Sequence, residues 1–108
     1  MNKLFILFFS LTFSLSAFSQ DKLQEKAKEI SDEMTTVLSL DEETSEKIYY
    51  IQLKRFIDAQ KIRKVNKGDK EELKAELKKM QRNLWHNLKG VVGLDNMKSW
   101  KNYKKTRE

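Results

Sequence analysis

Apolar residues recur every three or four positions along most of this chain, which is the spacing of one face of an α-helix. No stretch keeps the strict alternation that is typical of a half-buried strand. The pattern predicts four helices, over about 22–38, 42–65, 70–89 and 96–105. The predicted fold class is therefore all-α: an antiparallel helical hairpin or bundle of three long helices plus a short C-terminal helix.

The helix boundaries are predicted from capping residues and glycines. We expect Gly68 and Gly90 to end the second and third helices, since glycine is favoured just after a helix. Before the second helix, Ser39 and Glu42 fit a capping box, and Asp41 is an alternative cap. A leucine followed by a capping aspartate occurs at two predicted helix starts, and these helix-start motifs comprise Leu40, Asp41, Leu94 and Asp95.

The second predicted helix has the broadest apolar surface. The first and third helices each carry one narrow stripe, whereas apolar residues of the second cover roughly 240° of its circumference at 100° per residue. In one interpretation the neighbouring helices cover this entire surface. In the other, part of it binds a second copy or a partner polypeptide, and the candidate residues are Tyr49, Tyr50, Leu53, Phe56 and Ile57.

Residues 1–19 have the pattern of a secretory signal peptide. Lys3 is followed by an apolar run, and the small residues of "AFS" precede Gln20. We predict cleavage after Ser19, a helical domain over residues 20–108, and a periplasmic or secreted location. The alternative is an uncleaved N-terminal anchor.

Charge and composition narrow the choice of partners. The formal net charge is +6, and the chain contains no cysteine, so neither disulfides nor cysteine metal sites are expected. The C-terminal basic stretch suggests contacts with an anionic membrane surface, and its candidate residues are Trp100, Lys101, Lys104, Lys105 and Arg107. Alternatively, Trp100 and Tyr103 attach the last helix to the bundle. Nucleic acid is not an expected partner, because the chain has an export signal and no nucleic-acid motif.

The sequence contains no recognisable catalytic set. His86 is the only histidine, and we expect it to be solvated. A metal or catalytic site needs convergent partners, and no glutamate lies at a helical metal-ligand spacing from this histidine. We therefore predict no enzyme activity, no cofactor and no metal site.

The two helix-start motifs, the export signal and the helical pattern together resemble the Spy/CpxP family of bacterial periplasmic proteins, which carry paired LTxxQ motifs. The corresponding stretches here are "LDEET" and "LDNMK". Asp41 and Asp95 replace the motif threonine, and Thr44 and Lys98 replace its glutamine. The resemblance implies an ATP-independent chaperone that forms a cradle-shaped dimer and binds unfolded clients on a concave surface of apolar and basic groups.

Three functional hypotheses follow. The first is an exported polypeptide-binding protein, chaperone-like or an envelope-stress accessory. The second is a peripheral envelope protein that binds anionic lipid through its basic, aromatic C-terminal helix. The third is a structural helical bundle without enzymatic activity.

Overall fold

The computed structural model describes residues 21–107, and the predicted signal peptide lies outside this range. The described residues form helices joined by short loops, with no strand among them, which confirms the all-α class. None of the helices within 21–107 has the length and hydropathy needed to span a membrane.

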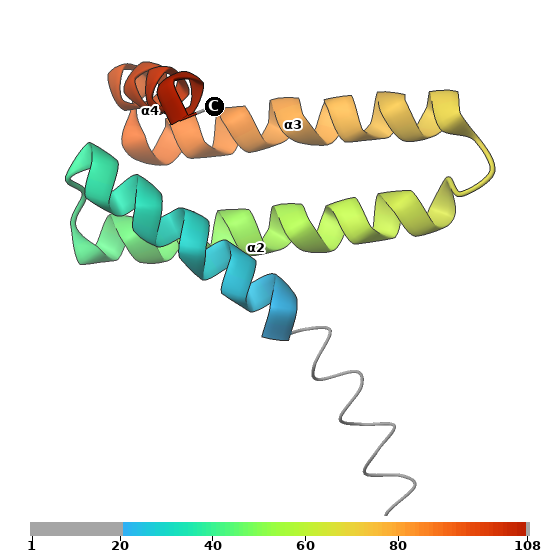
Figure 1. Cartoon of the computed structure of the whole chain (residues 1–108), viewed down its shortest axis with the longest axis horizontal. Helices are drawn as coiled ribbons and strands as arrows, with labels where there is room; N and C mark the ends of the chain where they lie inside the picture. Colours follow the sequence, from blue (N-terminus) through green and yellow to red (C-terminus); the bar gives the residue numbers. More distant parts are fainter. Residues whose placement is uncertain (1–20, 108) are drawn as a thin grey trace, which may run out of the picture.

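The chain is helical over residues 21–38, the 21–38 helix, and continues with α2 (Glu42–Val65), α3 (Lys70–Val92) and α4 (Leu94–Arg107). The helices α2 and α3 lie side by side, and the chain reverses direction in the loop between them (Figure 1). The 21–38 helix crosses α2 obliquely, and α4 lies at the end of the pair where α3 finishes (Figure 1). We call α2 and α3 together the α2–α3 pair.

The capping alternatives before α2 are decided by the backbone. Ser39 has φ 53°, and the N–H of Leu40 donates to the carbonyl of Thr35 at 3.0 Å, so Ser39 ends the 21–38 helix in a left-handed conformation. Asp41 is the N-cap of α2, and its Oδ1 accepts a hydrogen bond from the N–H of Thr44 at 2.8 Å. Ser39 therefore belongs to the end of one helix and not to a capping box of the next.

The bounds of α2 agree with the prediction, but Gly68 does not end it. The C-cap is Asn66, whose side-chain amide donates to the carbonyl of Ile62 at 2.9 Å. Asp69 caps α3 as expected, because its Oδ1 accepts from the N–H of Glu72 at 3.1 Å. The asparagine side chain supplies the hydrogen bond at this helix end, so a glycine in a left-handed conformation is not needed there.

The prediction that α3 ends at Gly90 was wrong. The helix continues through Gly90 to Val92, and Gly93, with φ 89°, is its C-cap. Leu94 is already the first residue of α4, two residues earlier than expected. A glycine inside a helix lowers its stability by only about 1 kcal/mol, so α3 can continue through Gly90. The helix ends at Gly93 instead, where the positive φ changes the direction of the chain before α4.

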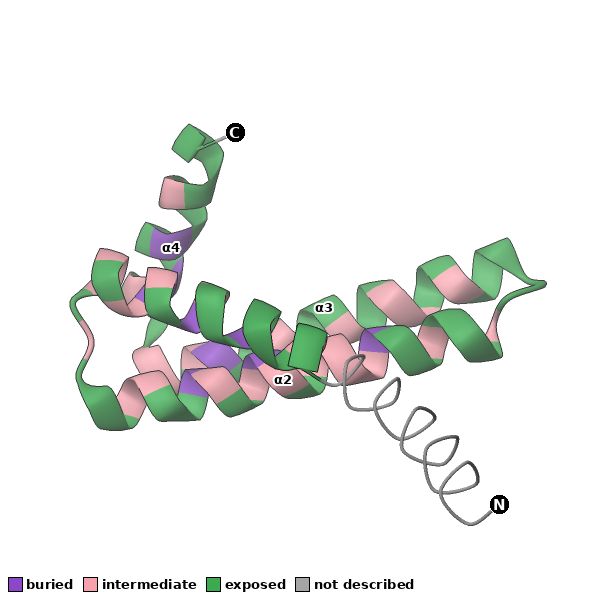
Figure 2. Cartoon of the chain, turned by 60° about the horizontal axis from the view of Figure 1, so that its bottom comes forward, coloured by how far each residue is buried: buried purple, intermediate pink, exposed green. Residues whose placement is uncertain are grey.

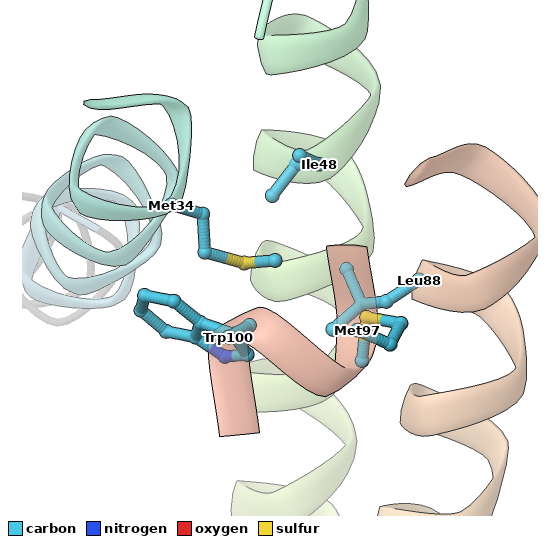
Figure 3. Packing of buried hydrophobic residues seen from close by; sticks show 5 residues of the cluster. All are labelled: Met34, Ile48, Leu88, Met97 and Trp100. Carbon is cyan, nitrogen blue, oxygen red and sulfur yellow. The ribbon is translucent and has the colours of Figure 1, made fainter. Parts of the chain in front are cut away.

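The core forms where the four helices meet. Met34 comes from the 21–38 helix, Ile48 from α2, Leu88 from α3, and Met97 and Trp100 from α4 (Figure 3). Each of these side chains is at most 3 % exposed. Fully burying one such side chain contributes roughly 1.5–3 kcal/mol, so this cluster is the main source of tertiary stability.

Hydrogen bonds also join the 21–38 helix to the start of α2. The Ser31 hydroxyl donates to the carbonyl of Ser45 at 2.8 Å, and the hydroxyl oxygens of Thr35 and Ser45 are 2.7 Å apart. Deeper in the interface, the buried Gln52 amide donates to the sulfur of Met34 at 3.7 Å. These contacts fix which face of α2 the 21–38 helix covers.

The buried residues are concentrated at one end of the α2–α3 pair (Figure 2). In α3 only Leu88 is buried, and in α2 only Ala59 is buried beyond Gln52. The other end consists of two helices in contact with each other alone (Figure 1). A two-helix segment cannot enclose its apolar side chains, so those near the α2–α3 loop stay partly exposed.

Candidate polypeptide-binding surface

An open groove runs between α2 and α3. Its volume is about 320 Å³, and its apolar lining comprises Ile51, Ile62, Met80 and Leu84. All four side chains are half-buried. Every residue that lines the groove belongs to α2 or α3. The groove is therefore formed by the α2–α3 pair without the 21–38 helix or α4.

The rim of the groove carries more positive than negative charge. Its charged residues are Lys54, Arg55, Lys61, Lys79, Asp58 and Glu76. Lys54 pairs with Asp58 at 2.8 Å, which leaves one acidic residue, Glu76, beside three basic ones. A concave apolar surface with a positive rim favours segments that combine apolar and acidic residues.

None of the five residues predicted as a binding surface on α2 lines this groove, although Tyr50 and Ile57 lie beside its rim. Tyr50 is 60 % exposed, and the other candidates, Tyr49, Leu53, Phe56 and Ile57, are half-buried. Tyr50 and Ile57 precede Lys54 and Lys61 by four residues, so they are their neighbours on the helix surface. Tyr50 and Ile57 therefore extend the apolar surface outward past the basic rim.

The three aromatic residues of the predicted α2 surface each have a contact within the chain. The rings of Tyr49 and Tyr50 meet edge to face, with centroids 5.2 Å apart. The guanidinium of Arg55 lies 4.5 Å from the centre of the Phe56 ring. Tyr50 is the member of the predicted surface most available to a partner.

At the C-terminal helix, one candidate contact needs correction. Trp100 is only 3 % exposed and packs in the core, so it cannot insert into a membrane surface from this position. The alternative role agrees with the structure: Trp100 belongs to the core cluster with Met34, Ile48 and Leu88, and Tyr103, whose ring stacks on Trp100 with centroids 5.5 Å apart, packs against that cluster. An aromatic residue at a helical spacing within a basic stretch cannot be assigned to core or surface until the neighbouring helices are known.

The basic candidates of α4 divide into two groups. Lys101 and Lys105 are exposed, and Lys104 lies 5.8 Å from the centre of the Trp100 ring. Arg107 forms an ion pair with Glu33 of the 21–38 helix at 2.6 Å, and the Tyr103 hydroxyl donates to the same carboxylate at 2.8 Å. These bonds lower the pKa of Glu33, that from Arg107 most strongly, and Arg107 has a structural role here.

The two helix-start motifs occupy unlike positions. Leu40 packs against the core and Asp41 caps α2, as the motif predicts. Leu94 is 47 % exposed and stands, with Asp95, inside the first turn of α4. Asp95 can stabilise that helix through the dipole at its N-terminus, but the second copy does not repeat the geometry of the first.

The groove itself was not predicted. Periodicity indicates that Met80 and Leu84 share a stripe, but not whether a third helix covers that stripe. The helix lengths indicate that part of α3 stays uncovered, because α4 has 14 residues and α3 has 23, so α4 is too short to cover α3 along its whole length. Arg55 was also missed, since an arginine between apolar positions is usually solvated.

Within 21–107 no three histidine or acidic side chains converge as metal ligands would. His86 is exposed, and its ring meets the edge of Trp85 at a centroid distance of 5.7 Å.

No protein-family model, no characterised protein and no solved structure significantly matches this chain. The resemblance to the Spy/CpxP family therefore remains a proposal that depends on the motifs and the helical layout.

Proposed function

We propose that this chain is an exported, ATP-independent polypeptide-binding protein of Spy/CpxP-like type, chaperone-like or an envelope-stress accessory. In this proposal it is an antiparallel helical hairpin, flanked by two further helices, that binds without chemistry and can pair with a second copy. The occupant of the groove is a segment of unfolded polypeptide that carries apolar and acidic side chains.

The observation that carries the proposal is the groove between α2 and α3. Ile51, Ile62, Met80 and Leu84 are accessible from one side, although a folded domain usually buries such residues. Four basic side chains around them attract acidic segments at long range, and the apolar lining then provides weak contacts. Methionine adapts to irregular partners, so Met80 suits a site that binds many sequences.

Suppression of aggregation tests this function. We expect the purified protein, at equimolar amounts and without nucleotide, to delay aggregation of a chemically unfolded client followed by light scattering. The double variant Ile62→Glu and Met80→Glu should lose most of this activity, because two carboxylates would replace the apolar lining and repel acidic segments. Neither residue belongs to the buried cluster, so the fold should persist.

Val65→Glu is the matched control. Val65 is 80 % exposed and does not line the groove, so this variant should protect the client as the native protein does. A second double variant, Tyr50→Asp with Ile57→Asp, should reduce activity less, because these residues lie outside the groove. If the Ile62→Glu and Met80→Glu variant protects the client fully, the groove is not the binding surface.

A second proposal is binding to anionic lipid through α4, and the exposure of Lys101 and Lys105 supports it. The buried Trp100 would not take part, so the contact would be electrostatic and would weaken as salt is added. Sedimentation with phosphatidylglycerol vesicles tests it, with Lys101→Glu plus Lys105→Glu expected to abolish binding. If neither client nor vesicles are bound, the remaining hypothesis is a structural bundle.

A further inference from the structure

A second, smaller cavity lies where all four helices meet. Its volume is about 90 Å³, and six of its lining residues carry polar groups or indole rings: Gln52, Arg55, Gln81, Trp85, Trp100 and Lys104. No acidic side chain lines it. Arg55 and Leu84 line both this cavity and the groove, so they separate the two spaces.

Arg55 is the unusual residue of this cavity. Its side chain is half-buried, it donates one hydrogen bond to Gln52 Oε1 at 3.3 Å, and it rests on the Phe56 ring. Within residues 21–107 no carboxylate pairs with it. Burial, and to a smaller extent the charge of Arg63, lower the pKa of Arg55. A partly desolvated guanidinium has five N–H donors and favours an anion as its partner.

The remaining walls restrict what that anion can be. Lys104 adds a second positive charge, and the indoles of Trp85 and Trp100 provide apolar walls. Liquid water occupies about 30 Å³ per molecule, so the cavity has room for a carboxylate and a few carbon atoms. A planar carboxylate matches the fork of a guanidinium and can accept two parallel hydrogen bonds from it.

We propose that this cavity binds a carboxylate carried on a short apolar stem, either the C-terminal residue of a polypeptide or a small free acid. Arg55 receives the carboxylate, Lys104 adds to the positive potential, and the two indoles contact the stem. This inference does not depend on the proposed function, because a small acid can bind here whether or not the groove holds a polypeptide.

The chain reports on this cavity through its own fluorescence. It contains two tryptophans, and both line the cavity. We expect a saturable change in emission when the purified protein is titrated with acetyl-Ala-Ala-Leu as the free acid, and a response at least about tenfold weaker to the same peptide as its amide. A tenfold loss corresponds to about 1.4 kcal/mol, as expected for one charged hydrogen-bonded contact.

Titration with 4-methylpentanoate, whose apolar stem resembles that of leucine, distinguishes a free acid from a polypeptide C-terminus. A response to 4-methylpentanoate shows that a free acid suffices. Binding of the peptide acid without a response to 4-methylpentanoate assigns the site to a polypeptide C-terminus.

Variants test the role of Arg55. Arg55→Gln should weaken binding of the peptide acid at least about tenfold and remove the preference for the acid over the amide. Arg55→Lys keeps the positive charge and should retain part of this preference. Arg63→Gln, an exposed arginine two turns further along α2, removes the same charge and should leave binding unchanged. If Arg55→Gln does not fold by circular dichroism, the acid and amide titrations of the unaltered protein decide the matter. Equal responses to acid and amide, or no response to any acid, would overturn the proposal.

Discussion

Individual residues at the helix junctions determine how the N- and C-terminal parts of this chain are held together. The carboxylate of Glu33 accepts from both Tyr103 and Arg107, which lie about 70 residues further along the chain. Its side chain is 28 % exposed and that of Arg107 is 52 % exposed, so solvent screens the pair and its contribution is about 0.5–1 kcal/mol. The contribution still matters, because a domain of this size is only marginally stable.

The Glu33 contact predicts a pH-dependent stability. The folded state lowers the pKa of this carboxyl from its ordinary value of 4.5, so the stabilisation is present above that value and is lost as pH falls through the lower, folded pKa. Glu33→Gln should lower the melting temperature by roughly 2–8 °C at neutral pH and by much less at an acidic pH well below 4.5. Glu29→Gln, an exposed acid of the same helix, is the control and should change little at either pH. An equal loss for Glu33→Gln at both pH values would contradict this assignment.

At the scale of the helices, sequence patterns predicted α2 and the start of α3 well, because Asp41 and Asp69 cap them by local hydrogen bonds. The junction of α3 with α4 was predicted less well. There the sequence offers Gly90 and Gly93 as alternative helix ends, and the choice depends on where Met97 and Trp100 must be placed to reach the core. Tertiary packing therefore determines the boundary between α3 and α4, and this boundary cannot be predicted from the local sequence pattern.

The two glycines predict opposite effects of alanine. Gly90 lies inside α3, and a Cβ there meets nothing within 4 Å, so Gly90→Ala should raise the free energy of unfolding by about 0.5–1 kcal/mol. Gly93 has φ 89°, a conformation that strains any residue with a side chain, so Gly93→Ala should lower the free energy of unfolding by about 1–2 kcal/mol. Urea denaturation of both variants measures the two changes. Stabilisation by Gly93→Ala would show that the positive φ is not required.

At the scale of the molecule, the arrangement places the 21–38 helix and α4 at one end of the α2–α3 pair (Figure 1). In one of the two interpretations of the sequence, part of the apolar surface of α2 stays uncovered by its neighbours, and Tyr50 agrees with it at 60 % exposure. The sequence did not predict the groove between α2 and α3, because its coverage depends on how far along the pair the flanking helices reach. Arg55 illustrates the same limit, since its burial depends on packing between three helices.

Because the flanking helices leave the α2–α3 groove open, the groove can also take part in self-association. A small domain with an open apolar groove gains stability when a partner covers it. A second copy is therefore a competing occupant of the groove, and a dimer formed in this way would release the surface when a client binds. Oligomeric state and client binding should then change together with protein concentration.

Methionine methyl groups provide the most direct test of the central claim, which is that the α2–α3 groove binds unfolded polypeptide. Among the described residues the methionines are Met34, Met80 and Met97, of which Met80 alone lines the groove, while Met34 and Met97 are buried in the core. We predict that adding an unfolded client to protein labelled with ¹³C at these methyls shifts or broadens the Met80 resonance and leaves the other two in place. An unchanged Met80 resonance in the presence of bound client would contradict the account.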